Sequence, residues 1–223
     1  MDKTYKNNNI EIEKPPTGPG PIRYSNAVLE AIAKWICLKQ DIITFAQTTS
    51  GGWEGWAQVE LAYELTRVLG YQYNEGSTIW LKRESHTYTN AAQRIDMEIV
   101  APGSQGSVLF ELKCERGPPL KSDPKNTGHY IPDTAPSKSS AAVFAEDMED
   151  DRKKIKTQLK ANSPYSAVFA IGIAVTEKAA QEMEKNSEFT QYESNYAIHP
   201  ITIWYWQLQR ETMQKTGFFG PKK

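Results

Sequence analysis

Three charged side chains, on two neighbouring segments of the chain, have the types and spacing to hold a metal ion beside a phosphate. Asp96 lies in segment 94–99, in which apolar and charged residues alternate, whereas Glu111 and Lys113 end a more apolar segment, 108–113. Side chains two residues apart on a β-strand point to the same face. Glu111 and Lys113 therefore share a face, and pairing of the two strands as a hairpin brings Asp96 beside them.

These groups suit metal-assisted hydrolysis of a phosphodiester. Mg²⁺ takes oxygen ligands and is usually bound through one or two carboxylates, several waters and substrate phosphate oxygens. A bound Mg²⁺ polarises a phosphoryl oxygen and lowers the pKa of a bound water. A lysine beside it can orient the water and offset charge on the phosphate, and the backbone carbonyl of Leu112 is a further possible ligand. The same alternation is, however, typical of any half-exposed antiparallel strand.

The flanking sequence predicts the elements that must position these residues. A helix is expected over 56–69, where apolar residues recur at helical spacing, and a strand over 77–82 precedes the two motif strands. Glycine, serine and proline between the motif strands predict a turn. A second helix is expected over 142–160 and a buried strand over 166–175. The apolar stripe of the first helix consists of Leu61, Ala62, Leu65, Val68 and Leu69.

In this order of elements, and at Asp96 and Glu111-Leu112-Lys113, the chain resembles the PD-(D/E)xK nuclease superfamily. The resemblance covers about residues 54–175. It implies an α/β fold with a restriction endonuclease-like core, a central mixed β-sheet flanked by helices in the order helix, three strands, helix, strand. A helix over 26–38 and a strand over 201–208 would be added at the two ends.

The resemblance also implies an activity, a cofactor and roles for these residues. The protein would be a metal-dependent endonuclease, with DNA as the expected substrate and RNA left open, and with Mg²⁺ as cofactor and Mn²⁺ as a substitute. Asp96, Glu111 and the carbonyl of Leu112 would bind the metal, and Lys113 would orient the attacking water. The proline that precedes the aspartate in many members is Ile95 here.

Many members add a glutamate from the first helix. Glu60 matches that position best and is expected to be both catalytic and metal-binding. It lies away from the apolar stripe, beside Glu64, which is the nearest rival, while Glu54 at the helix start would favour the helix dipole. An ordinary solvated carboxylate is an equal alternative for Glu60.

Composition limits the domain organisation. The chain has 223 residues, 39% of them hydrophobic, which suits one domain, 23–223, after a flexible leader, 1–22. No apolar run approaches the ~20 residues of a membrane span, and no classical secretory signal is present. Two cysteines and three histidines give no zinc-ligand spacing. Cys114 is expected in the core, Glu115 at a solvated strand end, and the segment 115–140 as a long loop.

The net charge of −1 argues against a non-specific nucleic-acid binder, which is usually basic. Clustered lysines and arginines offer a local phosphate-facing patch. For any single lysine or arginine, a place on a solvated helix face is the better explanation, because acidic residues precede these basic residues on the same helix. The candidate patch consists of Arg152, Lys153, Lys154 and Lys156 on the helix and Lys121, Lys125 and Lys138 in the preceding loop.

Several biological settings and one other class of protein stay open. A restriction-type enzyme in the cytoplasm and a toxin effector delivered into a target cell, neutralised by an immunity or inhibitor protein, both fit, and a homodimer is possible. The alternative is a non-catalytic binding protein on the same scaffold, supported by 6 Trp, 11 Tyr and 7 Phe that can furnish an interface. A glycosidase with paired acids is a distant third.

Overall fold

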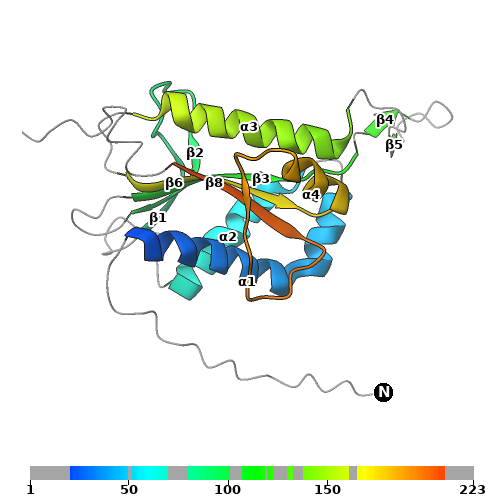
Figure 1. Cartoon of the computed structure of the whole chain (residues 1–223), viewed down its shortest axis with the longest axis horizontal. Helices are drawn as coiled ribbons and strands as arrows, with labels where there is room; N and C mark the ends of the chain where they lie inside the picture. Colours follow the sequence, from blue (N-terminus) through cyan, green and yellow to red (C-terminus); the bar gives the residue numbers. More distant parts are fainter. Residues whose placement is uncertain are drawn as a thin grey trace, which may run out of the picture.

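A computed structural model describes residues 21–49, 52–69, 80–100, 107–118, 120–122, 130–132, 138–160 and 165–208. In this part of the chain, a six-stranded mixed sheet is flanked by four helices (Figure 1). The elements are α1 (Pro21–Gln47), α2 (Glu54–Leu69), β1 (Trp80–Ser85), β2 (Ile95–Val100), β3 (Ser107–Cys114), β4 (Leu120–Ser122), β5 (Tyr130–Pro132), α3 (Ser140–Gln158), β6 (Tyr165–Ala174), α4 (Glu177–Glu184), β7 (Thr190–Gln191) and β8 (Thr202–Leu208).

The sheet has the strand order β1-β2-β3-β6-β8-β7. Its first three strands form an antiparallel meander, and β6 then pairs parallel with β3. A parallel neighbour requires a crossover connection, which α3 provides. The strands β8 and β7 extend the sheet by antiparallel pairing. The predicted α/β class with a mixed sheet and an added C-terminal strand is therefore confirmed.

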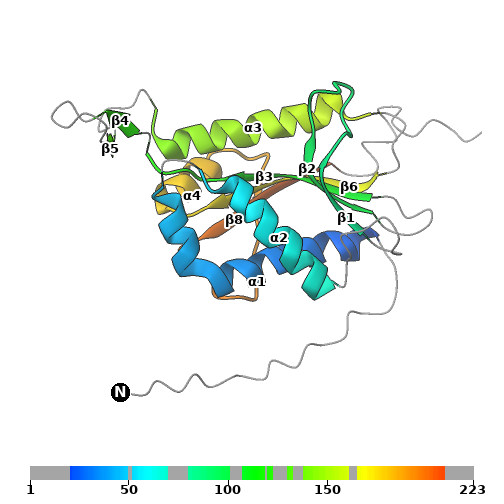
Figure 2. The same cartoon turned by 180° about the vertical axis from the view of Figure 1, so that it is seen from behind.

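The two faces of the sheet carry separate apolar cores. Helices α1 and α2 lie on one side of the sheet and α3 on the other, as both views show (Figures 1 and 2). The core under α1 and α2 includes Trp35, Leu61 and Phe110, and the core under α3 and α4 includes Phe144 and Met183. Burial of both faces explains why β3 and β6 are almost wholly buried and rich in apolar residues.

Helix α3 begins where the sequence supplies a cap. The hydroxyl of Ser139 accepts a hydrogen bond from the N–H of Ala142 at 3.2 Å, which satisfies one of the free donors of the first turn. Toward the sheet, α3 lies very close to β6 at Gly172. A β-carbon on Gly172 would lie 2.7 Å from the sulfur of Met148 and 2.9 Å from Phe144. Glycine at this position therefore permits the close approach of α3.

Most expected elements lie within three residues of their predicted limits, and the exceptions have physical reasons. Helix α1 is longer at both ends than the expected 26–38, and at its C-terminal end buried residues continue as far as Ile43. It begins within the predicted leader, of which residues 1–20 lie outside the described residues. The expected long loop 115–140 contains two short paired strands, β4 and β5.

Within the described ranges, no helix has the length and apolar character needed to cross a membrane.

Candidate active site

The two motif strands bring Asp96 next to Glu111. Strands β2 and β3 pair antiparallel with Met97 opposite Phe110, so the register places Asp96 opposite Glu111. The backbone N–H of Leu112 donates a hydrogen bond to Oδ2 of Asp96 at 2.7 Å. This bond ties the aspartate to the neighbouring strand, as the hairpin prediction requires.

Glu111 is almost completely buried, with 3% of its surface exposed. The hydroxyl of Tyr88, from the segment between β1 and β2, donates a hydrogen bond to its Oε1. The ammonium of Lys154, on α3, lies 2.7 Å from the same oxygen. A buried carboxylate needs such partners because burial removes its hydration.

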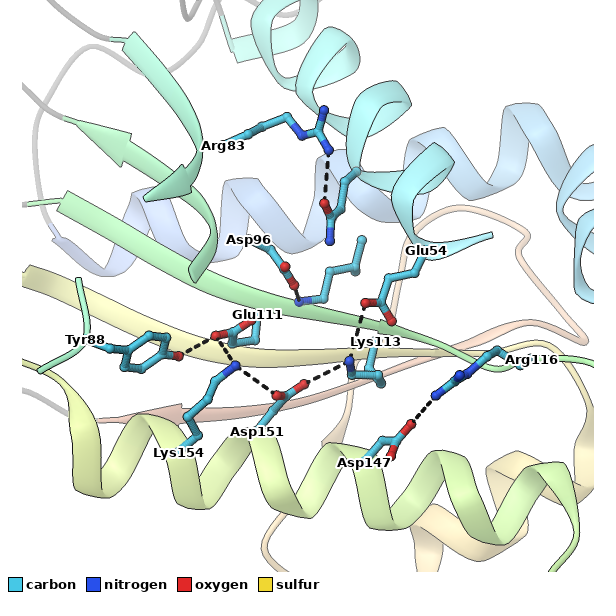
Figure 3. A network of polar contacts seen from close by, with 12 residues as sticks. Glu54, Arg83, Tyr88, Asp96, Glu111, Lys113, Arg116, Asp147, Asp151 and Lys154 are labelled. Atoms are coloured by element: carbon cyan, nitrogen blue, oxygen red, sulfur yellow. Dashed lines mark hydrogen bonds and ion pairs between the residues drawn. The ribbon is translucent and has the colours of Figure 1, made fainter. Parts of the chain in front are cut away.

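Lys113 lies between carboxylates from the two helical layers (Figure 3). Its Nζ is 3.3 Å from Oε1 of Glu54 on α2 and 3.5 Å from Oδ2 of Asp151 on α3. Asp151 in turn lies 3.3 Å from Lys154. Acidic and basic groups therefore alternate through the structure in the order Glu111, Lys154, Asp151, Lys113 and Glu54, a set that we call the charged cluster.

Burial and crowding of like charges raise the pKa values of the carboxyl groups. Burial, together with the nearby charge of Glu111, raises the pKa of Asp96 from 3.8 to about 8. Burial also raises the pKa of Glu111, although the charge of Lys154 opposes the effect. At Glu54 burial again raises the pKa, against the opposing charge of Lys113. A raised pKa means that burial penalises the charged form of the carboxyl group, and a nearby cation offsets that penalty.

The pKa values of the basic groups and of Tyr88 are also raised. Burial lowers the pKa of Lys113, but the carboxylates of Asp151, Glu54 and Asp96 outweigh burial and raise it. The pKa of Lys154 is raised in the same way, mainly through Glu111 and Asp151. Burial and the charge of Glu111 raise the pKa of Tyr88. Both lysines stay charged, and the tyrosine stays a neutral hydrogen-bond donor.

The donor chemistry of the site fits a hard divalent cation. Asp96, Glu111 and Asp151 supply oxygen atoms, the ligands that Mg²⁺ prefers. Oδ2 of Asp151 is buried and has no hydrogen-bond partner in the described part of the chain, although Lys113 lies nearby. Among the described residues, however, no three His, Cys, Asp or Glu side chains converge closely enough to hold a metal ion in the present arrangement.

The helix carboxylate that reaches the cluster is Glu54. The expected Glu60 instead forms an ion pair with Lys39 of α1 at 3.3 Å, and its rival Glu64 binds Arg67 on its own helix. The reason is that α2 begins at Glu54, two residues before its predicted start, and its first turn meets Lys113 of β3. Glu60 lies further along α2, where α1 covers it.

The proposed basic patch is largely neutralised. Arg152 pairs with Glu149 and Glu188, and Lys138 pairs with Glu146. Of the patch, Lys154 enters the charged cluster. The side chains of Lys121 and Lys125 lie outside the described residues.

Three members of the site were not expected in a site role from the sequence, namely Glu54, Tyr88 and Asp151, whereas Lys154 was expected only as part of a phosphate-facing patch. A signal for Asp151 was present, because it falls on the buried stripe of α3 that contains Phe144, Met148 and Ile155. A charged residue on an apolar helix face requires a partner. Lys154 follows one turn later, whereas nothing in the local sequence marks Tyr88.

Two neighbours of the motif serve the fold. Cys114 is buried, as expected, and burial raises the pKa of its thiol. Glu115 is 1% exposed, so the expected solvated strand end is wrong. Its carboxylate accepts hydrogen bonds from the N–H groups of Val175 and Thr176 and from the Thr176 hydroxyl, each at 2.7 Å. Glu115 therefore fixes the junction between β6 and α4.

Comparison of the chain with models of protein families, with curated proteins and with solved structures finds no match in any of the three.

Proposed function

We propose that this chain is a metal-dependent endonuclease of the PD-(D/E)xK type. The observation that carries the proposal is the pair of carboxylates, Asp96 and Glu111, held side by side on adjacent strands with Lys113 one position further along the same face. The raised pKa of Asp96 supports it, because a group that holds a proton at neutral pH for want of a cation is a candidate metal ligand.

The order of elements supports the restriction endonuclease-like core. Helix α2, the meander β1-β2-β3, helix α3 and the parallel strand β6 follow one another in the order that the family has. In this chain, groups from helices on both sides of the sheet meet the motif lysine. Glu54 from α2 and Asp151 from α3 meet Lys113 in this way.

Each residue has a distinct task in the proposed reaction. Asp96 and Glu111 would hold Mg²⁺ or Mn²⁺, with Glu54 or Asp151 as the further carboxylate. The bound cation would supply charge stabilisation at the phosphate and acidify a water. Lys113 would keep that water oriented and offset the negative charge that develops on the phosphoryl oxygens. Tyr88 would hold the Glu111 carboxylate in position through its hydroxyl.

The test is cleavage of plasmid DNA and of total RNA with Mg²⁺, Mn²⁺ or EDTA. We expect metal-dependent loss of DNA by the wild-type chain and none by Glu111→Ala. Glu146→Gln is the matched control, because Glu146 is an exposed carboxylate that pairs with Lys138 on the surface. Cleavage by Glu111→Ala equal to that of wild type and control would contradict the assignment. Loss of RNA without loss of DNA would show that RNA is the substrate.

A second candidate function is a non-catalytic binding protein. It is favoured by large apolar side chains that are exposed on the outer helices: Leu38, Ile42 and Phe45 on α1, and Val59 and Tyr63 on α2. Such a face suits a protein partner. This candidate predicts no cleavage and no change in melting temperature with Mg²⁺ or Mn²⁺.

A further inference from the structure

Lys154 lies directly beside the carboxylate of Glu111, in the position that a cation bound by this carboxylate would take. Its ammonium lies 2.7 Å from Oε1 of Glu111 and 3.3 Å from Oδ1 of Asp151. It also lies over the ring of Tyr88, 5.1 Å from the centroid, at a distance where an ammonium and an aromatic ring attract each other. Its side chain is only 22% exposed. Figure 3 shows this ammonium between the two carboxylates.

We propose that Lys154 acts as an internal counter-ion that competes with the metal for Glu111, so that metal loading requires displacement of its ammonium. This inference rests on the proposed function, because it assumes that Glu111 is a metal ligand. It concerns regulation of the site rather than the hydrolysis step. The charged cluster is thus the metal-free arrangement of these residues. The metal-bound site would be a second arrangement, in which the ammonium of Lys154 has moved away from Glu111.

The physical argument begins with charge balance. A buried carboxylate without a partner is costly, and Lys154 satisfies both Glu111 and Asp151 before any metal arrives. An incoming cation must therefore replace contacts that are already favourable, and its apparent affinity falls by the free energy of those contacts. This explains why, in the described residues, the carboxylates alternate with lysines instead of converging on one point.

The neighbouring Lys153 provides a matched control. It has the same charge and lies on the same helix, but its side chain is 60% exposed and its partners, Glu149 and Asp150, belong to α3 itself. Substitution of Lys153 changes the charge of the protein equally without touching Glu111. A change in metal affinity that occurs on substitution of Lys154 but not of Lys153 is therefore caused by loss of the contacts within the charged cluster.

The experiment is calorimetric titration of Mn²⁺ into the full chain without nucleic acid, for wild type, Lys154→Met and Lys153→Met. We expect Lys154→Met to bind Mn²⁺ more tightly, on the order of tenfold, and Lys153→Met to bind as wild type does. The increase in melting temperature on adding Mn²⁺ should also be larger for Lys154→Met. A merely structural lysine would lower the melting temperature equally with and without metal.

Outcomes against the inference are distinguishable from failure of the proposed function. If wild type binds Mn²⁺ and Glu111→Ala does not, but Lys154→Met binds with unchanged or weaker affinity, competition by Lys154 is wrong and the metal site stands. If wild type binds no Mn²⁺ and Lys154→Met binds none either, both proposals fail. Should Lys154→Met not fold, Lys154→Gln takes its place with the same expected gain in affinity, and unchanged affinity there likewise overturns competition.

Discussion

Glu54 and Glu60 show how far a residue's role depends on its neighbours. Both are glutamates on α2 with partly exposed side chains, and both form one ion pair at 3.3 Å. The partner of Glu54 is Lys113 of the motif, whereas the partner of Glu60 is Lys39 on the outer helix α1. Only the first pair links a helix carboxylate to the proposed reaction.

We therefore expect Glu54→Gln to lower the rate of metal-dependent cleavage by tenfold or more, on the order of what loss of a group supporting a metal site costs. Glu60→Gln should retain the wild-type rate within about a factor of two, because it loses a half-exposed ion pair of small energetic value. Rates measured side by side on plasmid DNA check this. A large loss in Glu60→Gln with none in Glu54→Gln would restore Glu60 as the helix carboxylate.

The raised pKa of Asp96 predicts a pH dependence of stability in the metal-free protein. The folded protein holds a proton on Asp96 up to about pH 8, whereas the unfolded chain releases it near 3.8. Between these two pH values the folded state binds more protons than the unfolded chain, so the free energy of unfolding falls as the pH rises. The contribution of Asp96 is therefore fully present below pH 3.8 and is lost as the pH rises toward 8. Asp96→Asn should remove this part of the slope.

Melting temperatures of metal-free wild type and Asp96→Asn, recorded between pH 4 and 8.5, check this expectation. Mn²⁺ binding should also release a proton below pH 8, which titrations in buffers of different ionisation enthalpy detect. Identical pH profiles of the two proteins would contradict the raised pKa of Asp96.

At the scale of elements, the distance between α3 and the sheet decides whether the cluster forms. Gly172 of β6 is the strand neighbour of Lys113, and its missing side chain lets α3 approach closely enough for Asp151 and Lys154 to reach Lys113 and Glu111. The same helix contributes two of the five members of the cluster. A small change at Gly172 therefore acts on every contact that α3 makes within the cluster.

Gly172→Ala should lower the free energy of unfolding by about 1–3 kcal/mol, the usual cost of overpacking a core. Its new β-carbon meets the side chains of Met148 and Phe144. It should also weaken cleavage by shifting α3. Gly55→Ala is the control, because no atom lies within 4 Å of its β-carbon and alanine favours a helix. Urea unfolding and plasmid cleavage measure both effects, and equal stability of the two variants would contradict the close-approach argument.

At the scale of the whole molecule, the charge balance implies that the proposed enzyme would need its cation before a nucleic acid could bind. The chain has a net charge of −1, and most cations of the expected basic patch are paired with acids. In Figure 3, Arg83 lies above the cluster and Arg116 lies to its right, and Arg116 is 58% exposed beside Asp147. In the proposed enzyme, a bound divalent ion and these arginines would together attract the phosphate backbone.

The sequence by itself determined most of the elements, including the two motif strands. Alternation in 94–99, the apolar run 108–113 and the spacing of α3 predicted β2, β3 and their neighbours to within a few residues, because such patterns follow from which side of an element is buried. The same alternation put Glu111 and Lys113 on one face and Cys114 in the core. These are local properties, and a sequence records them directly.

Only the tertiary structure decided which residues surround the motif. Tyr88, Glu54 and Lys154 come from three separate segments, and their meeting depends on the path of the chain over the sheet and on the position of both helices. The burial of Glu115 and the pairing of Glu60 with Lys39 depend on the same packing. Hydrogen bonds and ion pairs act over a few ångströms in space, so spacing along the chain cannot specify them.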